Sequence, residues 1–265
     1  MDSISRLVVK INRCDSVKNI DEKDVLILRA INQLISGTKE ELTKKLDEYE
    51  KDFSQHTSVL TLRSFQDYMD SEYAVLPEIE NGEFKDRAEI LSQYYAVKKE
   101  VVKVLEESGI SYRYEDGGLK SVKRSVEKAN FLEKLGHGKR VPDLTRGRFV
   151  MKNIKDVEKA ATAIIHAVDL LVVGIWNLFL EKKWNPYETD FKAFVMAFIT
   201  SYKEDFTKFS TELQFLTEAS NAMANLNHPY DLAKVLEYDI AEDKEFVEML
   251  MKKVAIYDYF KFKLL

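Results

Sequence analysis

Apolar side chains at helical spacing dominate the first part of the chain. Thr38 and Glu41 have the spacing of a capping box, and apolar residues follow them every three or four positions. Residues 85–107 carry a second, broader apolar stripe. We therefore expect residues 20–108 to be largely helical, with Asn81-Gly82 as a turn between two helical pieces.

The pattern changes near residue 109, where glycines and apolar runs replace the helical spacing. These runs predict four strands, at residues 144–151, 170–180, 191–202 and 206–216. A basic helix over residues 120–135 precedes them, a helix over 156–168 lies among them, and an amphipathic helix over 242–262 ends the chain. Helices, then a small sheet, then helices predict an α+β fold.

Composition limits the kind of protein and its surroundings. With 265 residues, 45% of them apolar, the chain can bury a core in one large domain or two modest ones. Cys14 is the only cysteine, which excludes an intrachain disulfide and a thiolate metal site. The N-terminus lacks the apolar core of a signal peptide, and the most apolar run, residues 163–180, contains polar residues. We expect a cytoplasmic protein with no membrane span.

Positive charge is concentrated in one stretch of an acidic chain. The net charge is -5, which argues against bulk binding to nucleic acid. Between Lys120 and Arg148, however, nine basic residues face three acidic ones, a local excess of six positive charges. Lys120, Arg124 and Lys128 recur every four residues, so they are predicted to share one helix face. Such a stripe either neutralises a triphosphate or is a solvated basic face.

Two carboxylates stand at or near the starts of predicted strands. Asp143 precedes the first strand, and Glu212 lies in the fourth, where alternation places it on the same face as Gln214. One Asp and one Glu on neighbouring strands can hold Mg²⁺ across phosphate oxygens and orient an attacking hydroxyl. Equally, each could cap a turn or pair with an arginine. The four histidines show no metal-binding spacing.

These segments together resemble the synthetase domain of the RelA/SpoT family, the alarmone synthetases and their toxin relatives. That family has two lysines eight apart around a serine, matched by Lys120, Ser125 and Lys128. Its Asp-Leu-x-x-x-Arg strand is matched by residues 143–148, and its Glu-(Ile/Leu)-Gln-(apolar)-x-Thr strand by residues 212–217. A His-x-x-Tyr element has a loose counterpart at His228-Pro-Tyr230.

The resemblance implies a domain plan and an activity. The core is expected at residues 85–235, a small mixed sheet of nucleotidyltransferase type flanked by helices. Residues 1–84 would be a mainly helical extension and 236–265 a C-terminal helix. The implied reaction moves the β,γ-pyrophosphate of ATP to a ribose hydroxyl of a nucleotide or of the 3′ end of tRNA. Besides ATP and the acceptor, an antitoxin or regulatory protein is an implied partner, and no membrane is.

The resemblance also assigns roles to individual residues. Asp143 and Glu212 would be the catalytic carboxylates and the Mg²⁺ ligands, with Glu212 orienting or deprotonating the acceptor hydroxyl. The expected ATP-binding residues are Lys120, Arg124, Ser125, Lys128 and Arg148. The expected acceptor-binding residues are Phe191, Lys192, Gln214 and His228.

Departures from the family pattern concern the acceptor more than the ATP site. The family's Gly-Tyr-x-x-x-His strand, whose tyrosine stacks on guanine, appears here as Asp190-Phe191 with no histidine after it. An arginine of the family is replaced by Gly118 and another by Leu216. The acceptor therefore stays open between a guanine nucleotide, an adenine nucleotide and tRNA. Two alternatives also stay open, a catalytically inactive nucleotide- or partner-binding module of the same fold and an unrelated helical interaction protein.

Overall fold

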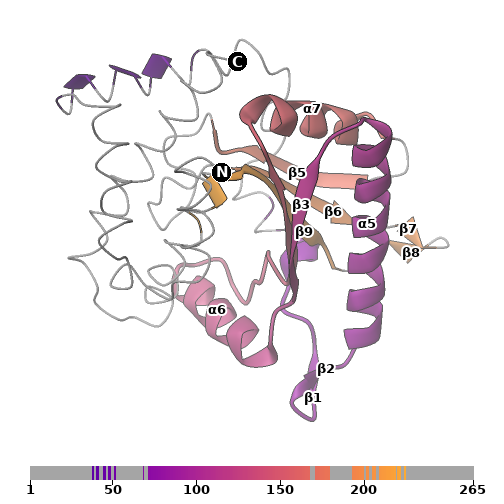
Figure 1. The fold of residues 1–265 in the computed structure, drawn as a ribbon. Coiled ribbons are helices and arrows are strands. Elements are labelled where there is room, and N and C mark those ends of the chain that lie inside the picture. The colour runs from indigo at the N-terminus through magenta and orange to yellow at the C-terminus, as the bar shows by residue number, and fades with distance from the viewer. Residues whose placement is uncertain are drawn as a thin grey trace, which may run out of the picture.

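The computed structural model in Figure 1 describes the central part of the chain. The described residues are 71–167, 171–179, 193–199, 201–202, 205–206, 209–218 and 220–221, with 38, 40–41, 44–45, 47–48, 51, 68 and 224 as isolated positions. The expected helix at 242–262 lies outside them, as does most of the expected N-terminal extension. The capping box is confirmed, since the Thr38 N–H donates to Glu41 Oε2 and the Glu41 N–H donates to Thr38 Oγ1.

A five-stranded mixed sheet forms the centre of the fold. Its strands are β3 (Tyr112–Leu119), β4 (Thr145–Met151), β5 (Leu171–Asn177), β6 (Phe194–Ile199) and β9 (Thr211–Thr217). They lie in the order β3-β4-β9-β6-β5, and β4 and β9 are parallel while the other neighbours are antiparallel. The predicted α+β class is confirmed.

Two helices cover one face of this sheet. Helix α5 (Arg87–Glu107) and helix α7 (Ile154–Ile165) lie against it in Figure 1. Their apolar stripes are buried there. Val101 of α5 and Val157 of α7 are fully buried in the same cluster as Phe149 of β4 and Phe215 of β9, whose rings stack at 5.4 Å. The opposite face carries polar side chains in the first part of β4 and β9, and the apolar Val150 and Leu216 further along.

Helix α6 (Val122–Lys134) lies on the other side of the strands from α5 in Figure 1. It packs through Ala129 against Val141 and Leu144, which belong to the turn before β4. Ser121 caps the helix by accepting a hydrogen bond from the Arg124 N–H. This packing places the basic helix directly beside the start of β4. Within the described residues, no helix is both long and apolar enough to cross a membrane.

The turn expected at Asn81-Gly82 is confirmed, but the expectation that it joins two helical pieces is wrong. Strands β1 (Ile79–Glu80) and β2 (Glu83–Phe84) form a small hairpin, preceded by a 3-10 turn, η2 (Glu72–Ala74). The turn is Asn81-Gly82, with φ of 53° and 82°. Asn-Gly favours positive φ at both central residues, which is the conformation that two-residue hairpins require.

Strand β3 was not predicted, because its sequence has little apolar alternation. It contains Gly117 and Gly118 and five charged or tyrosine side chains, which are exposed to varying degrees. It is an edge strand, so it needs only one apolar face, where Tyr112 and Tyr114 pack on Phe149 at 5.2 and 4.8 Å. The predicted strands at 191–202 and 206–216 are each interrupted, and the hairpin strands β7 (Ser201–Tyr202) and β8 (Asp205–Phe206) lie between β6 and β9.

Candidate active site

The two predicted carboxylates lie at the start of neighbouring parallel strands. Asp143 ends the turn two residues before β4, and Glu212 is the second residue of β9, opposite Arg146. Parallel strands bring the same ends together, so both carboxylates meet at one edge of the sheet. The predicted alternation in β9 is also confirmed, because Leu213 and Phe215 point into the core and Glu212 and Gln214 point away from it.

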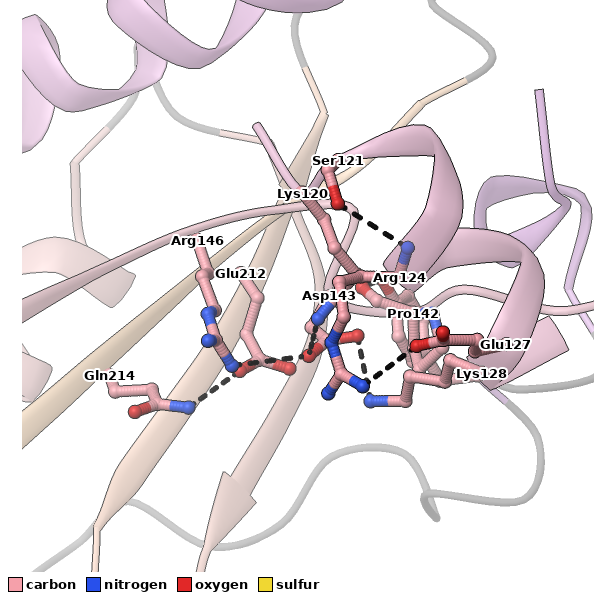
Figure 2. Close-up of polar contacts among 11 residues, drawn as sticks. Lys120, Ser121, Arg124, Glu127, Lys128, Pro142, Asp143, Arg146, Glu212 and Gln214 are labelled. Atoms are coloured by element: carbon pink, nitrogen blue, oxygen red, sulfur yellow. Dashed lines mark hydrogen bonds and ion pairs between the residues drawn. The ribbon is translucent and has the colours of Figure 1, made fainter. Parts of the chain in front are cut away.

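Asp143 is buried at the centre of three cations (Figure 2). Lys128 Nζ lies 2.7 Å from Oδ1, and Lys120 Nζ lies 3.0 Å from Oδ2. Arg146 Nη1 is 3.5 Å from the same Oδ2. Burial alone would raise the pKa of Asp143, but the charges of Lys120, Lys128 and Arg146 outweigh it and hold that pKa well below its usual value. Asp143 is therefore ionised, with an excess of positive charge around it.

The cations come from three different elements, which corrects the predicted helix stripe. Lys120 is not on the basic helix, because β3 ends at Leu119 and Ser121 is the N-cap of α6. Its N–H donates instead to the Leu144 carbonyl at 2.9 Å, which fixes the connection beside Asp143. Lys120 and Lys128 nevertheless converge on one carboxylate, so the predicted pairing of the two lysines is right although their shared helix face is wrong.

Burial makes Lys120 an unusual amine. Its side chain is 12% exposed, and desolvation lowers its pKa to about 8, with Lys128 and Arg146 adding to the effect and Asp143 opposing it. A buried lysine beside other cations favours the binding of an anion. A phosphate oxygen would reduce the repulsion among Lys120, Lys128 and Arg146.

Arg124 and Ser125 do not contact Asp143 as the three cations do. Arg124 Nη1 is 2.9 Å from Glu127 Oε2, one helical turn along α6, and not on Asp143. Ser125 is fully buried in α6, and among the described residues its hydroxyl has no hydrogen-bond partner. A buried hydroxyl of this kind either needs a ligand atom or is a packing residue.

Glu212 is partly buried, and its pKa is shifted in the opposite direction to the pKa of Asp143. Burial raises its pKa first, and the neighbouring Asp143 charge raises it further. Lys128 and the hydrogen bond from Gln214 Nε2 to Glu212 Oε1, at 2.7 Å, counteract this only in part. Two carboxylates whose environments drive their pKa values apart are typical of sites where one stays ionised and the other exchanges a proton.

Arg148 lies on the same sheet face but in a different set of contacts. Its Nε donates to Gln214 Oε1 at 2.9 Å, and its Nη1 donates to Asn221 Oδ1 at 3.2 Å. The structure thus separates Arg148 from the cations on Asp143. Sequence reasoning missed Arg146, although alternation along β4 puts it on the same face as Arg148. It also missed Asn221, for which the sequence carries no signal.

A tyrosine from the N-terminal region ties together the segments that carry the two carboxylates. Tyr68 is fully buried, its hydroxyl donates to the Pro142 carbonyl at 2.9 Å, and it hydrogen-bonds with Ser210 Oγ. Pro142 precedes Asp143, and Ser210 lies two residues before Glu212. The Tyr68 ring packs on Trp176 of β5 at 4.9 Å. The burial of this hydroxyl raises the pKa of Tyr68.

Three of the four predicted acceptor residues stay predictions. Phe191, Lys192 and His228 lie outside the described residues. Gln214 is described, but its amide engages Arg148 and Glu212. Val195 stands opposite Gln214 on β6 and is 3% exposed, so this position of the sheet face is apolar.

Comparison with known proteins identifies the fold. A scan against protein-family models finds no match, and a search of curated protein sequences finds none. Among solved structures, the small alarmone synthetase 1 of Bacillus subtilis bound to its product pppGpp is similar, with a TM-score of 0.52 and 19% identity over 68% of this chain and 96% of that one. A GTP pyrophosphokinase family protein of Streptococcus pneumoniae gives a TM-score of 0.52 and 14% identity over 68% of this chain and 93% of that one.

The class that follows from the sheet order and these likenesses is the RelA/SpoT-type synthetase fold. More particularly, the five-stranded mixed sheet and the three helices of the described residues match the fold of the small alarmone synthetases. The predicted resemblance is confirmed at the level of fold.

Proposed function

We propose that this protein is a Mg²⁺-dependent pyrophosphokinase that transfers the β,γ-pyrophosphate of ATP to a ribose hydroxyl. The acceptor hydroxyl belongs to a nucleotide or to the 3′ end of tRNA. The observation that carries the proposal is the site itself, in which ionised Asp143 lies among Lys120, Lys128 and Arg146 beside Glu212. The fold shared with small alarmone synthetases supports the same reaction class.

The three cations on Asp143 are the proposed triphosphate-binding groups. A triphosphate carries more negative charge than one carboxylate, so it would compete for Lys120 and Lys128. Arg146, whose side chain is 32% exposed, reaches Asp143 only at 3.5 Å and can turn toward a phosphate with little loss. Arg124 and Ser125 lie on the same helix as Lys128 and complete the proposed ATP side.

The carboxylates fit a magnesium ion that is shared with the substrate. Among the described residues, no group of three or more candidate ligands exists that could hold a metal by itself. Mg²⁺ sites of this kind use one or two carboxylates and complete the octahedron with phosphate oxygens and water. Asp143 and Glu212 supply that pair. When bound, Mg²⁺ supplies charge neutralisation on the phosphates that are being transferred.

Transfer is proposed to run as a single displacement. The acceptor hydroxyl oxygen bonds to the β-phosphorus of ATP, the bond from that phosphorus to the α,β-bridging oxygen breaks, and AMP leaves. Glu212, at the start of β9, orients the hydroxyl and takes its proton. Lys120, Lys128 and Arg146 hold the negative charge of the pyrophosphoryl group during transfer.

The test is a transfer assay with purified protein. ATP labelled at the γ-phosphate and Mg²⁺ would be incubated separately with GDP, GTP, ADP, AMP and bulk tRNA, and the products would be resolved. Label that moves to one acceptor establishes the reaction and names the substrate. Glu212→Gln should abolish the transfer while the protein keeps its fold and its affinity for ATP.

A non-catalytic binding module is the second candidate. It is favoured by one observation, that both oxygens of Asp143 already engage cations. Such a protein would bind ATP, as calorimetry would detect, without forming AMP over a long incubation. Label transfer to any acceptor rejects this candidate.

A further inference from the structure

A chain of hydrogen bonds crosses the polar face of the sheet and ends on the proposed catalytic glutamate. Arg113 of β3 donates to Glu115, and Asn221 Nδ2 donates to Glu115 Oε1 at 2.7 Å. Asn221 Oδ1 accepts from Arg148, whose Nε donates to Gln214 Oε1. Gln214 Nε2 then donates to Glu212 Oε1. The chain therefore runs from the outer edge strand through β4 to β9.

Because arginine can only donate hydrogen bonds, Arg148 decides which groups donate and which accept along the hydrogen-bonded chain. Arginine only donates, so Gln214 must present its carbonyl oxygen to Arg148 and its amide nitrogen to Glu212. Asn221 is oriented in the same way, with its oxygen on Arg148 and its nitrogen on Glu115. Neither amide can flip without placing two donors or two acceptors face to face. The arrangement thus has one stable orientation.

Burial makes this chain stiff. Asn221 is fully buried, and Gln214 is 8% exposed. A broken hydrogen bond at either amide would leave a polar group without water, which costs more than the bond itself contributes. Charge-assisted bonds to arginine are also stronger than bonds between neutral groups.

We infer that Gln214 and Arg148 are positioning residues, which hold the Glu212 carboxylate in one rotamer, and that Asn221 and Glu115 anchor them. This inference rests on the proposed function. Gln214 fixes Oε1 of Glu212, so Oε2 is the oxygen presented to the acceptor hydroxyl. The roles expected from sequence were different, with Gln214 binding the acceptor and Arg148 binding ATP. The hydrogen bonds that both side chains make toward Glu212 support the positioning role that we infer.

The first test separates positioning from acceptor binding. Gln214→Met keeps the length of the side chain and removes both hydrogen bonds. A misplaced catalytic group costs about 100-fold in rate, so kcat should fall about 100-fold while KM for ATP and for the acceptor stays within about twofold. Gln93→Met is the matched control, because Gln93 is equally buried at 6% exposure but lies on α5. A raised acceptor KM with unchanged kcat overturns the inference.

The second test uses rescue at the far end of the chain. Asn221→Asp keeps the acceptor for Arg148 but faces Glu115 with a second carboxylate, so stability and kcat should both fall, kcat by about 10-fold. Adding Glu115→Gln restores a donor opposite Asp and should restore both quantities. Rescue of stability without rescue of kcat overturns the inference and leaves the proposed function intact.

Failure of the proposed function has a different signature. If wild-type protein transfers no label to any acceptor, the proposed function fails. The unfolding free energies of wild type, Asn221→Asp and the double variant Asn221→Asp/Glu115→Gln then test the hydrogen-bonded chain by itself. A double variant whose unfolding free energy returns to the wild-type value supports the anchoring role of Asn221 and Glu115. A double variant as unstable as Asn221→Asp overturns it.

Discussion

Arg146 of β4 lies directly opposite Glu212 of β9, and its guanidinium reaches within 3.5 Å of Asp143 Oδ2. Its stem passes close to the neighbouring strand, where a Cβ at Gly117 would lie 2.7 Å from both Cγ and the carbonyl oxygen of Arg146. The absence of a side chain at position 117 thus allows Arg146 its place over the site. Arg146 is thus paired with Asp143 through its side chain and adjoins Glu212 through the strand register.

Removing this cation should weaken the proposed ATP site. Arg146→Met keeps the stem and removes the charge, so KM for ATP is expected to rise about 10-fold, consistent with the loss of one charge-assisted hydrogen bond. The measurement is the rate at a series of ATP concentrations. Lys123→Met is the control, because Lys123 is exposed on α6 and its substitution by Met removes the same single positive charge. An equal effect of both substitutions would mean that Arg146 acts only through net charge.

Asp143→Asn should abolish transfer and also destabilise the protein. It leaves Lys120 and Lys128 buried without their carboxylate, and breaking one partner of a buried pair costs about 3–5 kcal/mol. Urea unfolding would measure the loss. Because the two lysines repel each other without Asp143, inorganic triphosphate should recover part of that stability. A variant with wild-type stability would show that the cations do not depend on Asp143.

The pKa of Lys120 predicts how stability depends on pH. Its folded pKa, about 8, is below the ordinary value of 10.5, so between these pH values the unfolded chain binds the extra proton. The free energy of unfolding therefore rises with pH across this window, by up to about 1.4 kcal/mol per pKa unit. Below pH 8 the cost of charging the buried amine is fully present.

Lys120→Met isolates this contribution. Burial raises the pKa of Tyr94 and raises that of Tyr114 to about 12, and such groups lower stability as pH rises past 10. The difference between wild type and Lys120→Met, followed by urea unfolding from pH 7.5 to 9.5, avoids that region. A difference that does not change with pH would show that Lys120 has an ordinary pKa.

Tyr68→Phe tests whether the N-terminal region supports the site. The substitution keeps the ring on Trp176 but removes the hydroxyl from Pro142 and Ser210. Stability should fall by about 1–2 kcal/mol, and kcat should fall as well, because the segments before Asp143 and Glu212 lose their common tie. Tyr73→Phe is the control, since only the backbone carbonyl of Tyr73 meets Ser210 in this contact. Unchanged kcat would make Tyr68 a packing residue alone.

The sequence predicted β4 and β9 because both have a regular alternation that decides which side chains enter the core. It could not show that Lys120 lies outside α6. The spacing of four residues from Lys120 to Arg124 does not reveal that the helix begins between them, with Ser121 as its N-cap. Strand β3 was missed because an edge strand needs few apolar residues. Tyr68 and Asn221 reach the site through tertiary contacts that no local pattern records.

The most direct measurement of the central claim is the amount of AMP formed per molecule of labelled acceptor. Wild-type protein with Mg²⁺, ATP and the accepted substrate should release one AMP for each product, with no ADP, because the pyrophosphoryl group moves as a unit. The ratio should hold at every time point. Formation of ADP in place of AMP would contradict pyrophosphate transfer and indicate transfer or hydrolysis of the γ-phosphate alone.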